Sequence, residues 1–267
     1  MTVAITRKVS PAITRCELTH LARTSIDYDK AVRQHECYER ALRDLGCEVV
    51  ALPTEPELPD SVFVEDPAIV LEEVAVITRP GAESRRPETP SIAAALRNYR
   101  VLLEMTPPAT LDGGDVLRIG RDVYVGISGR TNAAAVQQLQ SLLAPFGYSV
   151  SGVTVEGCLH LKSAITQVAP DTVLFNPAWV SLESFGDSLP GMRHLSCAAG
   201  EDYAANALMV EQSVIYPTSF PRTAAILERE GVRVVQVDVS ELQKAEGAVT
   251  CCSLVFSGST ERRQRDQ

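Results

Sequence analysis

The hydrophobic and polar positions of this chain repeat one pattern, in which an amphipathic helix is followed by a short break and then by an apolar strand. Apolar residues recurring three and four positions apart predict each helix, and short runs rich in Val, Ile and Leu predict each strand. This pattern predicts an α/β protein. Four copies are clear, with helix and strand at 29–45 and 47–52, 91–96 and 100–105, 132–143 and 148–153, and 222–227 and 232–237.

Further strand-like runs lie between these copies, so each repeat is predicted to be a β-β-α-β unit. The wide interval before the last clear copy leaves room for a degraded copy at 179–197. Repeats of this length favour a radial or stacked assembly of about five units. The alternative is one doubly wound α/β sheet with insertions. The additional runs are 62–64, 68–77, 116–127, 164–175 and 207–216.

The composition is that of an ordinary globular protein, with 267 residues of which 45% are hydrophobic. We predict a single domain over residues 1–256 and a polar C-terminal tail over 257–267. The net charge of −9, from 25 Lys and Arg against 34 Asp and Glu, leaves no basic surface for phosphates or anionic lipid. We therefore expect no nucleic-acid or membrane partner, whereas a small cationic ligand is compatible with this charge.

Several classes of protein find no support in the sequence. No apolar run approaches the roughly 18 residues that span a bilayer, and the chain start lacks the apolar region of a signal peptide. The seven cysteines include no C-x-x-C pair, and neither nucleotide-binding glycine motif is present. We therefore expect a cytoplasmic protein with reduced thiols, and no metal or cofactor.

Two stretches place carboxylates in apolar surroundings. In 59–67, Glu65 and Asp66 adjoin, and on a strand they would face opposite sides. A solvated turn is the alternative. In 111–116, the pair Gly113-Gly114 permits either a left-handed backbone or a close approach. A simple hairpin turn is the alternative there.

Two further stretches hold a histidine and a thiol pair. In 157–163, His160 stands between Leu159 and Leu161, where a hydrogen-bonded structural histidine is the alternative to a catalyst. In 246–255, Cys251 and Cys252 adjoin, and both could be small buried side chains of the last strand. Together the four stretches suggest a Cys-His-carboxylate site with carboxylates to spare for a cation.

Six stretches, taken in order, resemble the dimethylarginine dimethylaminohydrolase family of the guanidine-modifying pentein superfamily. The resemblance covers nearly the whole chain, and it implies a five-bladed α/β propeller of ββαβ units around a central site. It also implies hydrolysis of asymmetric dimethylarginine or monomethylarginine to citrulline and dimethylamine or methylamine, through a covalent cysteine S-alkylthiouronium. The matching stretches are 60–66, 77–82 with 84–86, 111–116, 130–132, 159–163 and 250–253.

The resemblance implies a catalytic role for three residues. Cys251 would be the nucleophile, His160 the general acid and base, and Asp112 the carboxylate that orients His160. No cofactor is implied.

The resemblance also implies a binding site for a small cationic amino acid. Asp66 would hold the guanidinium, with Asp60 and Glu65 in or near the pocket. The implied α-carboxylate ligands are Arg85 and Arg130, and the α-amine would meet the backbone near Leu18 and Ala245. Glu246 stands where the family has Asp, in a stretch that matches poorly.

Two other functions stay open at this point. An arginine deiminase-like hydrolase would act on another guanidine, although such enzymes tend to carry an added helical domain. A non-catalytic pentein, such as a ribosome anti-association factor, would use the propeller for binding only. The presence of Cys251, His160, Asp66 and Asp112 in one chain argues against the second alternative. From the resemblance we also expect a homodimer.

Overall fold

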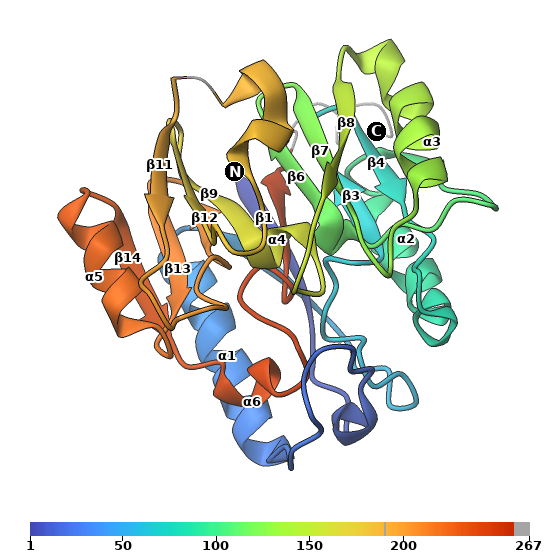
Figure 1. Ribbon diagram of the computed structural model, residues 1–267. Coiled ribbons are helices and arrows are strands. Elements are labelled where there is room, and N and C mark those ends of the chain that lie inside the picture. Colours follow the sequence, from blue (N-terminus) through green and yellow to red (C-terminus); the bar gives the residue numbers. More distant parts are fainter. Residues whose placement is uncertain (190, 259–267) are drawn as a thin grey trace.

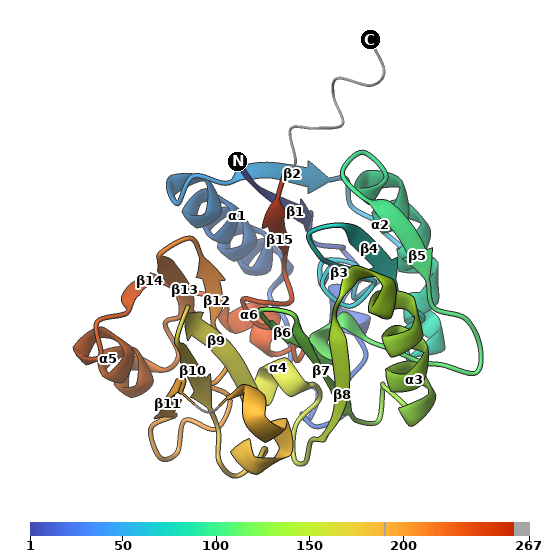
Figure 2. The ribbon, with the colours of Figure 1, turned by 90° about the horizontal axis from the view of Figure 1, so that it is seen from above.

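The computed structural model describes residues 1–189 and 191–258. It contains five three-stranded sheets, which stand around a common centre as the blades of a propeller (Figures 1 and 2). This confirms the predicted five-bladed α/β propeller of ββαβ units. The strands of the five blades are β15(Leu254–Ser257), β1(Thr2–Arg7) and β2(Glu48–Leu52); β3(Ala68–Val70), β4(Val74–Ile77) and β5(Val101–Glu104); β6(Val116–Ile119), β7(Asp122–Ile127) and β8(Ser149–Thr154); β9(Ile165–Ala169), β10(Thr172–Phe175) and β11(Arg193–Ser196); and β12(Leu208–Val210), β13(Ser213–Pro217) and β14(Arg233–Val237).

Every blade follows one plan. Its inner strand pairs antiparallel with the middle strand, and the middle strand pairs parallel with the outer strand. A parallel pair needs a crossover, and a helical segment supplies it in each blade. The α-helices are α1(Tyr28–Asp44), α2(Thr89–Leu96), α3(Ala133–Leu143), α4(Leu161–Ala164), α5(Pro221–Arg229) and α6(Ser240–Gln243), and the 3-10 segments are Ile13–Arg15, Glu83–Glu88, Gly113–Asp115, Ala144–Phe146 and Leu182–Ser188.

Two of the α-helices, α1 and α3, begin at a side-chain cap. Asp27 accepts a hydrogen bond from the backbone N–H of Lys30 at the start of α1, and Asn132 accepts one from Ala135 at the start of α3. Such a cap satisfies an N–H group that has no partner within the helix. The degraded copy predicted at 179–197 has a 3-10 segment, Leu182–Ser188, in place of an α-helix before β11.

The ring is closed by the two ends of the chain. Strand β15 pairs antiparallel with β1, with Ile5 opposite Leu254 and Val3 opposite Phe256. The sequence pattern did not predict β1, because the apolar residues between its polar ends form too short a run to be distinguished from a loop. The predicted tail lies outside the described residues from 259 onward, and Ser257 belongs to β15.

Buried apolar side chains join each blade to the next. One cluster unites Val3 and Ile5 of the first blade with Ala75 and Ile77 of the second, and four others bridge the remaining junctions. Each blade therefore buries its faces only against its neighbours. Among the described helices, none is both long and apolar enough to cross a membrane.

One predicted strand is wrong, because residues 62–64 lie in a series of turns before β3. The alternative that placed Cys251 and Cys252 in the last strand is also wrong, since both lie in a turn before β15. Val62 and Val64 are fully buried, so burial and not strand pairing explains their apolar character. Both segments are loops that run into the centre of the propeller.

Candidate active site

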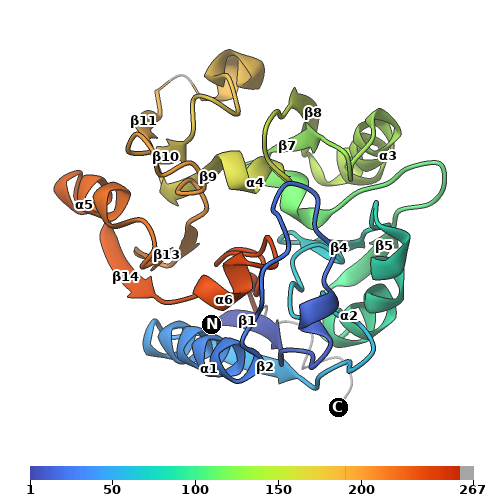
Figure 3. The same ribbon diagram turned by 60° about the horizontal axis from the view of Figure 1, so that its bottom comes forward.

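The loops that precede the inner strands bring the predicted site residues together. Asp66 precedes β3, Asp112 precedes β6, His160 precedes α4 and β9, and Cys251 precedes β15. Five repeats around one axis place equivalent loops at the centre of the ring, so residues far apart in sequence meet there (Figure 3). Cys251, His160, Asp66, Asp60, Arg85, Arg130 and Ala245 line one narrow cavity, which we call the catalytic cavity.

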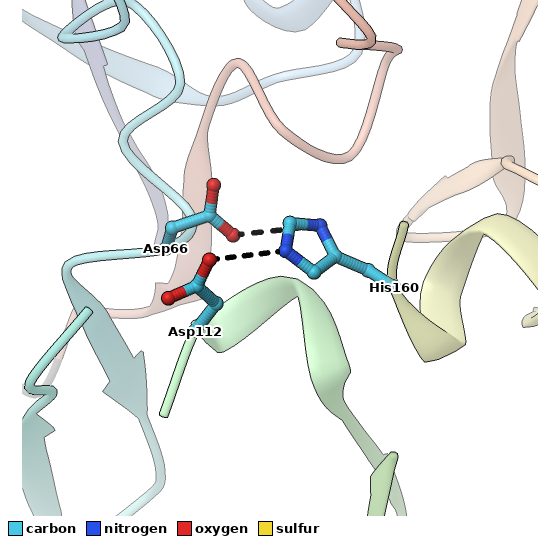
Figure 4. Close-up of side chains that lie close together, drawn as sticks. All are labelled: Asp66, Asp112 and His160. Carbon is cyan, nitrogen blue, oxygen red and sulfur yellow. Dashed lines mark hydrogen bonds and ion pairs between the residues drawn. The ribbon is translucent and has the colours of Figure 1, made fainter. Parts of the chain in front are cut away.

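His160 is held between two carboxylates (Figure 4). Its Nε2 lies 3.1 Å from Oδ2 of Asp112, and its Nδ1 lies 3.9 Å from Oδ1 of Asp66. Burial alone would lower the pKa of this imidazole, but the charges of Asp66, Asp112 and Asp115 raise it to about 9. The resting imidazole is therefore protonated at neutral pH and is equipped to donate a proton.

The glycine pair, which could admit the close approach of a ligand, is closely approached by other parts of the protein. A Cβ on Gly114 would stand 2.5 Å from Nδ1 of His160, and one on Gly113 would stand 2.1 Å from the carbonyl oxygen of Glu65. Neither glycine has a left-handed backbone. The groups that approach the pair are thus neighbouring parts of the protein, and the glycines let the loops of Asp66, Asp112 and His160 pack together.

Cys251 presents its sulfur to the same cavity while its backbone is fixed from behind. The N–H of Ala248 lies 3.4 Å from the sulfur, and the N–H of Glu65 donates to the carbonyl oxygen of Cys251. Burial raises the pKa of the Cys251 thiol to about 12, assisted by the charges of Glu65 and Asp66. Cys252 is fully buried and does not line this cavity, so the two neighbouring thiols have different environments.

Asp66 is the ionised carboxylate of the cavity. Burial acts to raise its pKa, but His160 and Arg85 together lower it to about 2. One oxygen accepts a hydrogen bond from the N–H of Gly114, and the other pairs with the Arg85 guanidinium. A carboxylate fixed in this way can accept parallel N–H bonds from a planar cation.

Arg85 is engaged by the protein itself. The residue is 4% exposed, and its guanidinium donates to the carboxylates of Asp66 and Glu88 and to the carbonyl oxygens of Asp60 and Phe63. These contacts position Asp66. The predicted binding of an α-carboxylate by Arg85 stays a prediction.

Arg130 also lines the catalytic cavity. It donates from Nη2 to the hydroxyl of Thr19, and its Nη1 lies 3.9 Å from Oδ2 of Asp112. The backbone of Arg130 packs on Gly81, where a Cβ would stand 2.3 Å from its carbonyl oxygen.

The structure separates Glu65 from the other carboxylates. Its side chain accepts from Lys162 at 2.6 Å and from Thr250 at 2.9 Å. Glu65 does not line the catalytic cavity, but its backbone N–H donates to the carbonyl oxygen of Cys251, so it lies next to the cavity. Its expected role in or near the pocket stays a prediction. Asp60, by contrast, lines the cavity and accepts from the N–H of Glu17.

The segment around Leu18 covers one side of the site (Figure 3). Three successive N–H groups, of Thr19, His20 and Leu21, donate to the carboxylate of Glu246 at 2.5 to 2.9 Å. Leu18 itself packs on the core and does not line the catalytic cavity, whereas Ala245 does. The role of Glu246 was missed by sequence reasoning, because its partners are backbone groups more than two hundred positions away.

Asp115 is a second residue that sequence reasoning missed. It is fully buried, and its carboxylate accepts from the N–H of Leu161 and from the hydroxyl of Ser128. It thereby fixes the start of α4 directly after His160. Its position beside the glycine pair is the signal that could have pointed to it.

One group of side chains has the geometry of a metal site. Ligand atoms of Asp66, Asp112 and His160 lie within 4.8 Å of one another. Both carboxylates already face a guanidinium, from Arg85 and Arg130 respectively. Because these guanidinium groups compensate the negative charge of the two carboxylates, the absence of a metal stays our prediction.

Comparison with known proteins places this chain in a known class. A sequence profile described as N,N dimethylarginine dimethylhydrolase, eukaryotic, matches residues 19–180. The chain is 39% identical over 232 residues to the N(G),N(G)-dimethylarginine dimethylaminohydrolase of Pseudomonas aeruginosa, covering 86% of this chain and 90% of that relative. It is 40% identical over 254 residues to the enzyme of the same name from Streptomyces coelicolor, covering 94% and 95%.

Solved structures agree with these relatives. The Pseudomonas aeruginosa enzyme, solved as a Cys-to-Ser mutant with citrulline, matches with a TM-score of 0.88 and 36% identity over 95% of this chain and 98% of that one. The N-terminal domain of ArgZ, a cyanobacterial arginine dihydrolase, matches with a TM-score of 0.82 at 18% identity, which shows the shared fold alone. The fold and the central cysteine and histidine define a guanidine-modifying pentein. Within that class, the chain belongs to the dimethylarginine dimethylaminohydrolase family.

Proposed function

We propose that this protein hydrolyses N-methylated arginine, as asymmetric dimethylarginine or monomethylarginine, to citrulline and dimethylamine or methylamine. The observation that carries the proposal is the meeting of Cys251, His160 and the ionised Asp66 at one narrow cavity. Asp66 would accept two parallel hydrogen bonds from the guanidinium, each contributing about 1.5–3 kcal/mol. Asp60 and Arg130 supply further charges at the same cavity.

The nucleophile would form in the complex with substrate. A guanidinium beside Asp66 compensates the negative charge that keeps the Cys251 thiol protonated, so the thiol loses its proton to solvent. The thiolate then attacks the guanidinium carbon and a C–S bond forms. His160 gives its proton to the leaving nitrogen as the C–N bond breaks, and dimethylamine or methylamine departs.

The same imidazole would serve the second half of the reaction. Neutral His160 takes a proton from a water molecule, whose oxygen attacks the S-alkylthiouronium carbon. The C–S bond then breaks, the Cys251 thiolate returns, and the last hydroxyl proton passes to solvent as the citrulline carbonyl forms. Asp112 keeps the ring oriented through its bond to Nε2. None of these steps calls on a cofactor.

Substitution of the two reacting residues tests the proposal. We expect Cys251→Ser and His160→Ala to lower citrulline formation by at least about 10²–10⁴-fold, because each removes a group that bonds to or exchanges protons with the reacting atoms. Cys252→Ser is the matched control and should retain activity. Circular dichroism should show an unchanged fold for all three. Near-normal turnover by Cys251→Ser would disprove the assignment.

The remaining expectations rest on the sequence alone. They are a cytoplasmic location and a homodimer, and both stay predictions.

A further inference from the structure

The fifth blade also places a polar side chain just before its inner strand. Asn206 stands two positions before β12, as Asp66 stands two positions before β3. The inner strands of all five blades lie nearest the centre of the ring (Figure 2). Asn206 is 4% exposed, so its amide group needs partners within the protein.

The backbone on both sides of Asn206 is fixed by one side chain of the neighbouring blade. The hydroxyl of Thr166, in β9, donates to the carbonyl oxygen of Ala205 at 2.6 Å and accepts from the N–H of Ala207 at 3.2 Å. All three of these residues are buried. Asn206 is therefore held against the blade whose loop carries His160.

The amide group of Asn206 joins two loops of the site. Its Nδ2 donates to the carbonyl oxygen of Lys162 at 3.2 Å and to the hydroxyl of Thr250 at 2.9 Å, and its Oδ1 accepts from the N–H of Thr250 at 3.1 Å. Lys162 lies two residues after His160, and Thr250 directly precedes Cys251. Because a carbonyl only accepts and a backbone N–H only donates, these partners fix the orientation of the amide.

A carboxylate joins the same two loops a second time. Glu65 pairs with Nζ of Lys162 at 2.6 Å and accepts from the hydroxyl of Thr250 at 2.9 Å. The Thr250 hydroxyl thus accepts from Asn206 and donates to Glu65. We call Asn206, Lys162, Thr250 and Glu65 the clamp. Since these polar groups satisfy one another, the clamp favours a single arrangement of the two loops.

The proposed reaction depends on how these two loops are placed. Among the described residues, no hydrogen bond joins the sulfur of Cys251 to the ring of His160. Their separation is therefore set by the backbone segments that carry them. The sulfur attacks the guanidinium carbon while the imidazole gives its proton to a nitrogen bonded to that carbon, and a misplacement of about 1 Å can cost about 10²-fold in rate.

We propose that Asn206 is a positioning residue, which sets the place of the Cys251 sulfur relative to the His160 imidazole. This inference rests on the proposed function. Within the described part of the chain, all side-chain hydrogen bonds of Asn206 go to Lys162 and Thr250, and Asn206 does not line the catalytic cavity. Its loss should therefore change the rate of the reaction and not the binding of the substrate.

Removal of the amide group tests this role. We would measure kcat and KM for citrulline formation from N-methyl-arginine, with rates expressed per folded molecule by circular dichroism. We expect Asn206→Ala to lower kcat by about 10²-fold. KM should change by less than about threefold, because Asp60, Asp66 and Arg130 keep their places at the catalytic cavity.

A second buried asparagine supplies the control. Asn176 is 6% exposed, donates to the carbonyl oxygen of Asp202 and accepts from the N–H of Ala178. Asn176→Ala therefore removes a buried amide of the same kind from outside the clamp. Its kcat per folded molecule should stay within about twofold of the wild-type value.

Substitutions of Thr250 separate positioning from packing. Thr250→Val keeps the shape of the side chain but loses the hydroxyl that contacts Asn206 and Glu65, and should lower kcat by at least about tenfold. Thr250→Ser keeps the hydroxyl and loses a methyl group, and its kcat should stay within about threefold of the wild-type value. A packing role would give the opposite order.

Three results would overturn the role of Asn206. They are a wild-type kcat in folded Asn206→Ala, a loss of activity in Asn206→Ala that is confined to KM, and an equal kcat in Thr250→Val and wild type. If Asn206→Ala does not fold, the Thr250 pair decides. Failure of the wild-type protein to hydrolyse N-methyl-arginine would instead refute the proposed function, and this inference with it.

Discussion

Cys251 and His160, the two residues proposed to react, are influenced by the same carboxylate, Asp66. The charge of Asp66 helps to raise the pKa of His160 to about 9. The pKa of Cys251 is raised to about 12, chiefly by burial and further by the charges of Glu65 and Asp66. At neutral pH the free protein therefore holds a protonated imidazole and a protonated thiol. Under the proposed function, a bound cationic substrate would shift this balance toward the thiolate of Cys251.

These pKa values set the expected pH dependence of kcat/KM. Below pH 9 the thiolate fraction of the free protein grows with pH while His160 keeps its proton, so kcat/KM should rise by about tenfold per pH unit. Above about pH 9, His160 loses its proton and the curve should flatten. Initial rates of citrulline formation between pH 6 and 9.5 would measure this. A flat profile from pH 6 to 8 would instead indicate a thiolate formed before substrate binds.

For single residues, the sequence predicted which of them meet at the site but not all of the contacts that each one makes. The pair Gly113-Gly114 was compatible with a close approach and with a simple hairpin turn, and only the packing of the surrounding loops decides between them. The engagement of Arg85 with Asp66 and Glu88 could not be predicted, because it depends on how a 3-10 segment packs against the loop at Asp60. The same holds for Glu65, whose partner Lys162 comes from a different blade.

Among the elements, the loops of the site depart furthest from the sequence pattern. Alternation and periodicity predicted most helices and strands to within a few residues, since each buries one face. The turns at 62–64 and at Cys251 are buried on all sides, so their apolar residues resemble strands. Tertiary packing, which the pattern does not contain, decides their conformation.

The segment at residues 19–21, which covers one side of the site, is held in place by the side chain of Glu246. Removal of the Glu246 carboxylate leaves three N–H groups without their acceptor, and a hydrogen bond to a charged group is worth about 1.5–3 kcal/mol. We expect Glu246→Ala to speed hydrogen exchange of the amides of residues 19–21 by at least about tenfold and to raise KM. Mass-spectrometric exchange would measure this.

A second glutamate supplies the control for that change. Glu211, like Glu246, has a left-handed backbone, with φ of 52° against 58°. Glu211→Ala therefore alters the same backbone strain away from the segment and should leave its exchange unchanged. Equal exchange of residues 19–21 in wild type and in Glu246→Ala would show that other contacts hold the segment.

The whole molecule is a closed ring, and its site exists only when the ring is complete. The loops before β15, β3, β6 and β9 supply Cys251, Asp66, Asp112 and His160 from four blades. The repeat predicted a radial or stacked assembly, because units of this kind cannot bury their faces alone, and the family resemblance implied the five-bladed propeller. The closure of the ring by the two chain ends could not be predicted, since β1 carries too little pattern of its own.

Ring closure gives a prediction about stability. Ile5 is fully buried in the closing strand, opposite Leu254. We expect Ile5→Ala to lower the free energy of unfolding by about 2–5 kcal/mol and Ile5→Val by about 0.5–1.5 kcal/mol, because each leaves a cavity between two blades. Urea denaturation followed by circular dichroism and by activity should give coincident transitions. Loss of activity well before loss of secondary structure would mean that the first blade unfolds separately.

The central claim is that the sulfur of Cys251 becomes bonded to the guanidinium carbon of the substrate. Rapid acid quenching during turnover of N-methyl-arginine, followed by digestion and fragmentation mass spectrometry, tests it most directly. The account predicts an S-alkylthiouronium on Cys251, with Cys252 unmodified, in the wild-type protein and none in Cys251→Ser. Turnover without an adduct, or an adduct on Cys252, would contradict it.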